Sequence, residues 1–251
     1  MKAMILAAGL GTRLRPLTDN RPKALVEIDG RTLLEVILSR LRSFGVGDVI
    51  INVHHFAETI VQYLKENDSF GMRIEVSRED ALLDTGGGLK KAAHFFLRRS
   101  AEGSSAEEPF IVHNVDVLSS IDLLRMVRFH SDHQGIATLA VQDRKSSRHL
   151  LFDDQFQLCG RRIGSAPPEL VGAAQPAYAL AFSGIHIVSP RLLAMLSEDG
   201  AFSIIGSYLR LAAAGEKILA FRADQYYWRD LGQPENVEQA AQDLKKKVIA
   251  L

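Results

Sequence analysis

The chain has a single cysteine, Cys159, among its 251 residues. One thiol excludes an internal disulfide and a zinc site built from several thiolates. The 30 basic residues balance the 30 acidic residues, so no net charge draws the chain to nucleic acid or to an anionic membrane. The sequence also lacks an apolar stretch of membrane-spanning length, and the apolar run before Gly9 is too short for a signal peptide. We therefore expect a cytoplasmic protein without a membrane or nucleic-acid partner.

Two common phosphate-binding motifs are also missing. Gly9 and Gly11 follow a short apolar strand, but Leu14 stands where the dinucleotide-binding pattern G-x-G-x-x-G needs its third glycine. A Walker A loop that starts at Gly9 would need glycine at this same position and lysine in place of Arg15. A nicotinamide-dependent oxidoreductase and a P-loop enzyme are therefore not expected.

The residues around these glycines nevertheless suit a nucleoside triphosphate. Glycine has no Cβ, so backbone amides in such a loop can approach a phosphate closely. Arg13 lies within the loop and Lys23 follows ten residues later, and both can neutralise phosphate charge. The stretch predicts a triphosphate site at the end of the first strand.

This stretch resembles the N-terminal motif of the sugar-1-phosphate nucleotidylyltransferases, also called nucleotide-sugar pyrophosphorylases. Their motif reads L-A-A-G-x-G-[ST]-R-[LM]-x-P-L-T and is followed by P-K-x-[LM], which residues 6–18 and 22–25 match. Further matches follow in the family order as LDTGGG at 83–88, NVD at 114–116, FSGI at 182–185 and WRDLG at 228–232. The resemblance therefore covers most of the chain.

The resemblance implies an enzyme that transfers a nucleotidyl group. An oxygen of a sugar 1-phosphate attacks the α-phosphorus of a nucleoside triphosphate, and pyrophosphate leaves. Arg13 and Lys23 are implied as the catalytic cations, and Mg²⁺ as the cofactor, since this ion prefers carboxylates together with phosphate oxygens. The implied ligands of the nucleotide are Ala8, Gly9, Leu10, Gly11, Thr12, Arg13, Thr85, Gly86 and Gly87; those of the sugar are Asn114 and Gly184; those of the metal are Asp116 and Asp230.

The short length, the Thr-Gly-Gly-Gly segment and the Phe-Ser-Gly-Ile segment are most similar to N-acetylmuramate-1-phosphate uridylyltransferases. UTP and N-acetylmuramate 1-phosphate, or a similar sugar, are therefore the expected substrates. A GTP-dependent mannose- or heptose-1-phosphate guanylyltransferase is the alternative. A catalytically silent nucleotide-sugar-binding regulatory protein is an alternative of another class. Many members of this family form oligomers, so the resemblance is also compatible with a homo-oligomer.

Two departures from the family pattern concern the metal and the sugar. Val115 replaces the usual glycine of Asn-Gly-Asp, and a β-branched residue disfavours a positive φ, so a different local backbone is expected. The Glu-Lys-Pro segment that many relatives use for the sugar is absent, and the corresponding region reads Cys159-Gly160-Arg161-Arg162-Ile163. Sugar recognition should therefore differ from that of those relatives.

The order of predicted elements indicates an α/β fold. Strands at 48–53 and 110–113 and helices at about 33–43 and 57–66 alternate as in a doubly wound, mostly parallel, Rossmann-like sheet. The resemblance implies the nucleotide-diphospho-sugar transferase type of this fold, with a smaller sugar-binding subregion. We expect one nucleotidyltransferase domain over 1–251. Residues 1–118 would form its NTP-binding half, and 119–251 its sugar-phosphate-binding half with the C-terminal helix.

Overall fold

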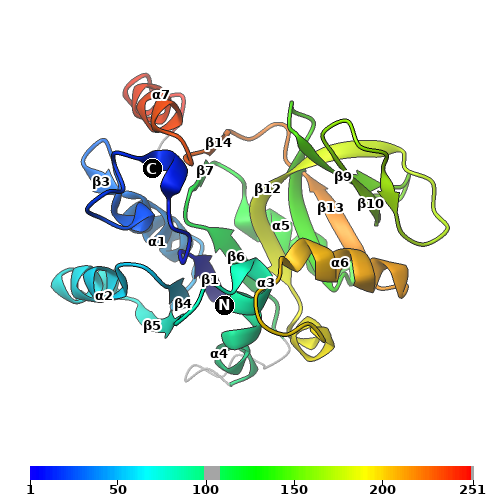
Figure 1. The fold of residues 1–251 in the computed structure, drawn as a ribbon, viewed down its shortest axis with the longest axis horizontal. Coiled ribbons are helices and arrows are strands. Elements are labelled where there is room, and N and C mark those ends of the chain that lie inside the picture. Colours follow the sequence, from blue (N-terminus) through cyan, green and yellow to red (C-terminus); the bar gives the residue numbers. More distant parts are fainter. Residues whose placement is uncertain (99–107, 250–251) are drawn as a thin grey trace. The chain divides into compact units, whose positions relative to one another are not determined.

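The computed structural model describes residues 1–98 and 108–249 (Figure 1). The strands are β1 (Lys2–Leu6), β2 (Glu27–Ile28), β3 (Arg31–Thr32), β4 (Asp48–Val53), β5 (Arg73–Arg78), β6 (Phe110–Asn114), β7 (Val117–Ser119), β8 (Ala137–Gln142), β9 (Arg148–Phe152), β10 (Leu158–Ile163), β11 (Glu169–Leu170), β12 (Tyr178–Val188), β13 (Ile218–Arg222) and β14 (Trp228–Asp230). The α-helices are α1 (Leu33–Ser43), α2 (Ala57–Glu66), α3 (Asp84–Lys91), α4 (Ala93–Leu97), α5 (Leu123–His133), α6 (Ile204–Ala213) and α7 (Pro234–Lys245). Short 3₁₀ helices are η1 (Thr12–Leu14), η2 (Lys23–Leu25), η3 (Asp68–Gly71) and η4 (Pro190–Met195).

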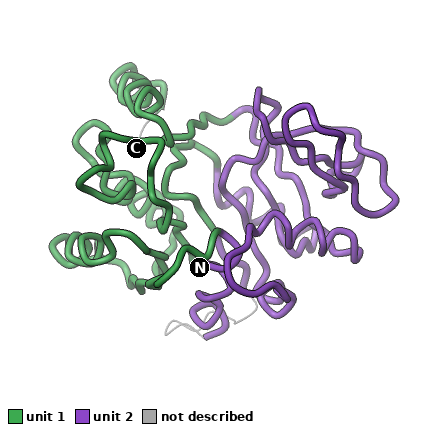
Figure 2. The backbone as a smooth tube through the Cα atoms, viewed as in Figure 1, with its two compact units in different colours: residues 1–84, 112–121, 226–251 green, residues 85–111, 122–225 purple. Residues whose placement is uncertain are grey.

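The chain forms two compact units, each made of separate segments (Figure 2). Unit 1 contains residues 1–84, 112–121 and 226–251, and unit 2 contains residues 85–111 and 122–225. The predicted NTP-binding and sugar-phosphate-binding halves, divided near residue 118, stay a prediction. The two compact units cannot be separated by cutting the sequence at one position.

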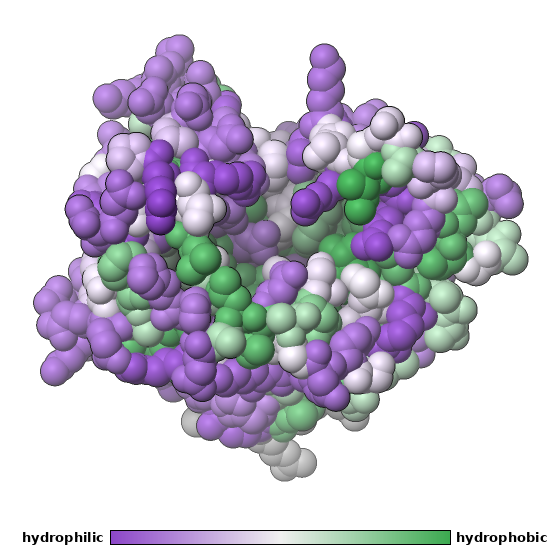
Figure 3. Space-filling view, in the orientation of Figure 1, coloured by the Kyte–Doolittle hydropathy of each residue, from purple (hydrophilic) through white to green (hydrophobic). Residues whose placement is uncertain are grey.

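The sheet of unit 1 has the order β6-β1-β4-β5, in which β1, β4 and β5 are parallel. Its central strands are buried, as their continuous apolar sequence predicts. Helix α1 begins where Thr32 caps it by accepting a hydrogen bond from the Glu35 amide at 3.1 Å. Hydrophilic residues dominate the surface around α2 and α7 in the space-filling view (Figure 3). This matches helices that bury only one face.

An apolar cluster in unit 1 lies under the segments that carry charged motif residues. Leu14 follows Arg13 and is fully buried, and Leu231 follows Asp230 and is 1% exposed. The remaining buried members are Val26, Ile28, Leu33, Val36, Leu118, Val237, Ala240 and Ile249. The cluster thus anchors the glycine loop, β7, β14 and α7 to one another by apolar contact.

Unit 2 is built on a mixed sheet with the order β11-β10-β9-β12-β8-β13. Only β8 and β13 are parallel within it, and the other neighbouring strands are antiparallel. With the parallel strands of unit 1, this confirms the α/β class expected from the sequence.

The glycines at 86–88 predict a helix that starts only after Gly88, but α3 begins at Asp84, so this prediction is wrong. Three glycines lie inside its first turns, and the backbone amides of Gly86 and Gly87 donate to the carbonyl oxygen of Phe202 at 2.9 and 3.3 Å. A Cβ added to Gly86 would lie 2.3 Å from the Phe202 ring, so only glycine permits this approach. Tertiary contact therefore stabilises a helical turn that glycine alone disfavours.

Within the described residues, no helix is both long enough and apolar enough to cross a membrane.

Candidate functional site

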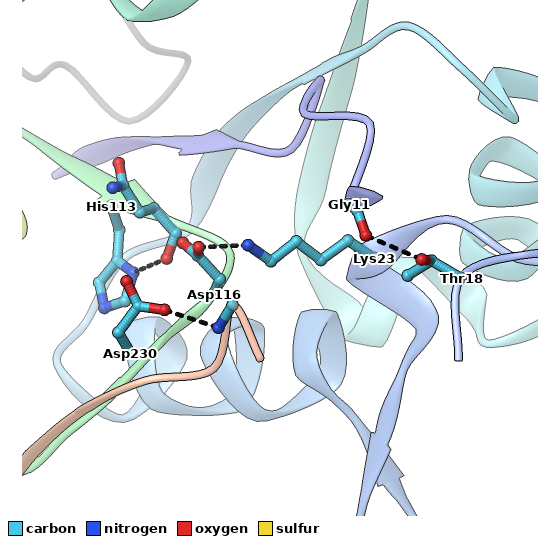
Figure 4. Close-up of polar contacts among 8 residues, drawn as sticks. Gly11, Thr18, Lys23, His113, Asp116 and Asp230 are labelled. Carbon is cyan, nitrogen blue, oxygen red and sulfur yellow. Dashed lines mark hydrogen bonds and ion pairs between the residues drawn. The ribbon is translucent and has the colours of Figure 1, made fainter. Parts of the chain in front are cut away.

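The glycine loop leaves the end of β1 as an exposed segment with a defined conformation. Gly11 has a φ of +66°, and its carbonyl oxygen accepts hydrogen bonds from the Leu14 amide at 2.8 Å and from Thr18 Oγ1 at 2.9 Å (Figure 4). A positive φ of this size suits glycine and few other residues. Gly9, Leu10, Thr12 and Arg13 are exposed, so their polar groups are accessible to a ligand.

Lys23 extends from η2 and forms an ion pair with Asp116 (Figure 4). The two side chains are only 11% and 16% exposed, so solvent screens the pair less than a surface ion pair. Asp116 lies in the turn between β6 and β7. The structure therefore brings together two residues that the sequence predicts for one site.

Asp230 reaches the same place from the far end of the chain. Strand β14 pairs with β7 in antiparallel register, with Asp230 opposite Val117, and the Leu231 amide donates to the Asp116 carbonyl oxygen at 2.7 Å. Asp230 Oδ1 accepts a hydrogen bond from the Gly232 amide at 2.6 Å. These contacts hold the Asp116 and Asp230 segments side by side.

Arg13 lies close to this carboxylate. A Cβ added to Gly232 would lie 2.6 Å from Asp230 Oδ1 and 2.9 Å from an Nη atom of Arg13. Gly232 is therefore the point at which the arginine and the aspartate side chains meet, and a side chain there would have to displace their ends. Two cations and two carboxylates thus come from four separate segments of unit 1.

The strand that leads to Asp116 carries a buried histidine. His113 donates from Nδ1 to the carbonyl oxygen of Asn114 at 2.8 Å, and burial lowers the pKa of His113 to about 4. The ring is therefore neutral at neutral pH and supports the turn after β6. Val115 in this turn is buried and has no positive φ, so valine replaces the family glycine without backbone strain.

The donors in unit 1 fit magnesium better than zinc. Asp116 and Asp230 supply carboxylate oxygens, and Mg²⁺ is commonly held by one or two carboxylates with phosphate oxygens and water. Over residues 1–98 and 108–249, no group of three or more histidine, cysteine, aspartate or glutamate residues could hold a metal ion by itself. A metal at these two carboxylates therefore depends on oxygen atoms from a ligand.

Of the remaining predicted site residues, Ala8 and Asn114 belong to unit 1, and Thr85, Gly86, Gly87 and Gly184 belong to unit 2. Thr85 Oγ1 accepts a hydrogen bond from the Ile204 amide at 3.0 Å, beside the Gly86 and Gly87 amides that donate to Phe202. Gly184 lies in β12 with a φ of +73°. A nucleotide that takes the two glycine amides must therefore replace the Phe202 carbonyl as their acceptor.

Two buried polar residues of unit 1 lie outside the sets of ligand residues that the sequence predicts. Asn52 at the end of β4 accepts a hydrogen bond from the Ala7 amide at 2.8 Å and donates to Glu79 at 2.7 Å. The other carboxylate oxygen of Glu79 accepts from the Leu83 amide at 3.0 Å. A polar residue near the end of an otherwise apolar strand was the sequence signal for Asn52.

Comparison with known proteins agrees with these features. The family model described as "Nucleotidyl transferase" matches residues 2–150. An N-acetylmuramate alpha-1-phosphate uridylyltransferase of Caulobacter vibrioides is 33% identical over 242 residues, which cover 93% of this chain and 92% of that protein. The chain belongs to the nucleotidyl transferase family. The resemblance stated from the motifs is thereby confirmed, and so is the expectation of an enzyme of this class.

Other relatives differ in the nucleotide that their names contain. A UTP–glucose-1-phosphate uridylyltransferase of Synechocystis is 29% identical over 99% of this chain, and a probable mannose-1-phosphate guanylyltransferase of rice is 30% identical over 94%. This chain spans only 64% and 62% of the lengths of these two proteins. The solved structure of HddC from Yersinia pseudotuberculosis, complexed with GMP-PN, has the same fold, with a TM-score of 0.76, 22% identity, and coverage of 97% of this chain and 99% of that one.

Proposed function

We propose that the chain catalyses the magnesium-dependent transfer of a uridylyl group from UTP to N-acetylmuramate 1-phosphate or a similar sugar 1-phosphate. The observation that carries this proposal is the meeting of Lys23 with Asp116 beside Asp230 and Arg13, at the end of the glycine loop. The similarity to the Caulobacter uridylyltransferase over nearly the whole of both chains supports the choice of substrates.

The reaction joins two anions, so cations must offset their repulsion. Two like charges about 4 Å apart repel by about 4 kcal/mol at an effective dielectric constant near 20. We assign Arg13 to the triphosphate and Lys23 to the α-phosphate and the incoming sugar phosphate. The amides of Gly9, Leu10 and Gly11 assist at the phosphates.

An oxygen of the sugar phosphate attacks the α-phosphorus and forms the new P–O bond. The bond from the α-phosphorus to the bridging oxygen breaks, and pyrophosphate leaves with that oxygen and its electron pair. Lys23 and Arg13 stabilise the charge on the reacting phosphates and need form no covalent bond with them.

We assign Asp116 and Asp230 to hold Mg²⁺. When bound, the ion supplies positive charge at the phosphate oxygens. Asp116 has two carboxylate oxygens, so it would hold the ion beside Lys23, whose ammonium group would face the phosphates.

We assign Asn114 and Gly184 to the sugar, and Thr85, Gly86 and Gly87 to the nucleotide. Gly184 lies in β12 and has no side chain. Since the Glu-Lys-Pro segment is missing, other groups of unit 2 must contact the sugar hydroxyls.

The test is pyrophosphate release with Mg²⁺, crossing UTP, GTP, CTP, ATP and dTTP with a panel of sugar 1-phosphates. Release with UTP and N-acetylmuramate 1-phosphate supports the proposal. Release only with GTP and mannose or heptose 1-phosphate would instead indicate a guanylyltransferase, the activity in the name of the rice relative. Tight binding of a nucleotide sugar without any release would indicate a regulatory protein.

A further inference from the structure

A buried hydrogen-bond chain in unit 1 joins the starts of the two segments that we assign to the nucleotide. It runs from the Ala7 amide to Asn52, from Asn52 to Glu79, and from Glu79 to the Leu83 amide. Ala7 directly precedes the glycine loop, and Leu83 directly precedes Asp84, where α3 begins. We propose that Glu79, acting through Asn52, is a positioning residue that fixes the Ala7 and Leu83 backbones, from which the two nucleotide segments start.

This series of hydrogen bonds requires one carboxylate. Both of its ends are backbone N–H donors, so the two side chains between them must accept at both ends and still bond to each other. Asn52 accepts from Ala7 and donates to Glu79, which leaves Glu79 to accept two hydrogen bonds, one on each oxygen. An amide and a carboxylate satisfy this pattern, whereas two amides leave one donor facing another donor.

Burial makes this requirement costly to break. Asn52 is 3% exposed and Glu79 is 4% exposed, so water cannot easily replace a lost partner. The backbone of Glu79 is held as well, because its amide donates to the Val53 carbonyl at 2.8 Å and its carbonyl accepts from His54 Nδ1 at 2.8 Å. Glu79 therefore ties the ends of β4 and β5 to both segments.

The same logic predicts that the two side-chain types can be exchanged. In the double variant N52D/E79Q, the carboxylate at 52 accepts from the Ala7 amide and from the new amide at 79. The new amide oxygen at 79 then accepts from the Leu83 amide. Every hydrogen bond is restored while the charge moves to the other position.

The experiment compares Glu79→Gln with N52D/E79Q, and uses Glu66→Gln, an exposed residue at the end of α2, as the control. The inference rests on the proposed function, so KM for UTP and for the sugar 1-phosphate is measured with kcat. Hydrogen exchange at the Ala7 and Leu83 amides is measured independently of activity. We expect Glu79→Gln to raise KM for UTP about tenfold, the size typical of one unpaired buried group, and to speed exchange at both amides.

Recovery separates positioning from direct contact. We expect the double variant to return KM for UTP and both exchange rates to within about twofold of the parent, with KM for the sugar 1-phosphate changed little throughout. If the double variant is as impaired in UTP binding as Glu79→Gln although its amides are protected, Glu79 contacts the nucleotide directly and the proposal is wrong. If the parent protein does not bind UTP, the proposed function is wrong. If hydrogen exchange at the Ala7 and Leu83 amides is unchanged in Glu79→Gln, the positioning role of Glu79 is wrong.

Discussion

Lys23 and Asp116 form a largely buried ion pair although they lie 93 residues apart in the sequence. Each residue depends on the other for compensation of its charge, and each is assigned a different partner during the reaction. Removing either one therefore leaves a partly buried charge without its partner, which costs more than the loss of a surface ion pair.

The first prediction concerns the carboxylate of this pair. Asp116→Asn should abolish magnesium-dependent pyrophosphate release, because an amide is a poor ligand for Mg²⁺ and cannot pair with Lys23. Circular dichroism should show a retained fold, and Asp154→Asn, in an exposed turn of unit 2, serves as the matched control. Activity of Asp116→Asn near that of the control would remove Asp116 from the site.

The second prediction concerns the lysine. Lys23→Ala should lower kcat by about 10²-fold or more, the range found when a charge-stabilising donor is removed. Its Kd for UTP should change much less, because we assign Lys23 to charge that develops during the reaction. Calorimetry with UTP and steady-state kinetics separate the two effects, with Lys65→Ala on the exposed face of α2 as the control. A change confined to UTP affinity would make Lys23 a binding residue only.

The third prediction concerns the helix that begins at Asp84. Gly86→Ala should destabilise the protein by about 1–3 kcal/mol, because the new methyl group overlaps the Phe202 ring. Adding Phe202→Ala should recover only part of this loss, since the Phe202 carbonyl oxygen would also lie 2.9 Å from the new Cβ.

Gly206 in α6 provides the opposite case for the same substitution. No atom lies within 4 Å of a Cβ added there, so Gly206→Ala should be neutral or stabilise the protein by up to about 1 kcal/mol. Urea unfolding gives the free energy of unfolding of Gly86→Ala, of its combination with Phe202→Ala, and of Gly206→Ala. Equal effects at Gly86 and Gly206 would contradict the close approach of Phe202.

The fourth prediction concerns acid. Burial lowers the pKa of His113 and of His130 from the ordinary value of 6.5 to about 4. Between roughly pH 6 and pH 4.5 the unfolded chain therefore binds more protons than the folded chain. Each histidine should then reduce stability by about 1.4 kcal/mol per pH unit as the pH falls.

A substitution at one histidine tests this slope. His130 bonds Thr138 and Ser189, each at 2.9 Å, so His130→Gln should cost stability at neutral pH but lower the slope between pH 6 and pH 4.5 by about 1.4 kcal/mol per pH unit. The pKa of Glu198 is lowered to about 2 by its hydrogen bond with Arg210, so its stabilising contribution is lost only at lower pH. Urea unfolding at several pH values checks the result, and an unchanged slope would contradict it.

Local signals in the sequence predicted many elements with their bounds. The apolar periodicity of α1 and α2, and the apolar run of β4, suffice because neighbouring residues determine these elements. α5 is not among the predicted helices, although Asp122 caps it by accepting from the Arg125 amide at 2.9 Å.

Features that depend on distant partners were less predictable. β7 and β14 have three residues each and exist because they pair with each other across the chain. The early start of α3 depends on Phe202, which no local pattern indicates. Motifs predicted Lys23, Asp116 and Asp230 for the site, but not the Asn52–Glu79 hydrogen bond, which requires β4 and β5 to lie side by side.

The apolar cluster beneath the glycine loop makes the loop dependent on residues at the opposite end of the sequence. Val237 and Ala240 of α7 and Ile249 beyond it share this cluster with Leu14, the neighbour of Arg13. Trimming α7 would uncover Leu14 and loosen the segment that carries Arg13, although no residue of the loop would have changed. A truncation of α7, or a fusion that disturbs its packing, is therefore expected to act on the glycine loop from a distance.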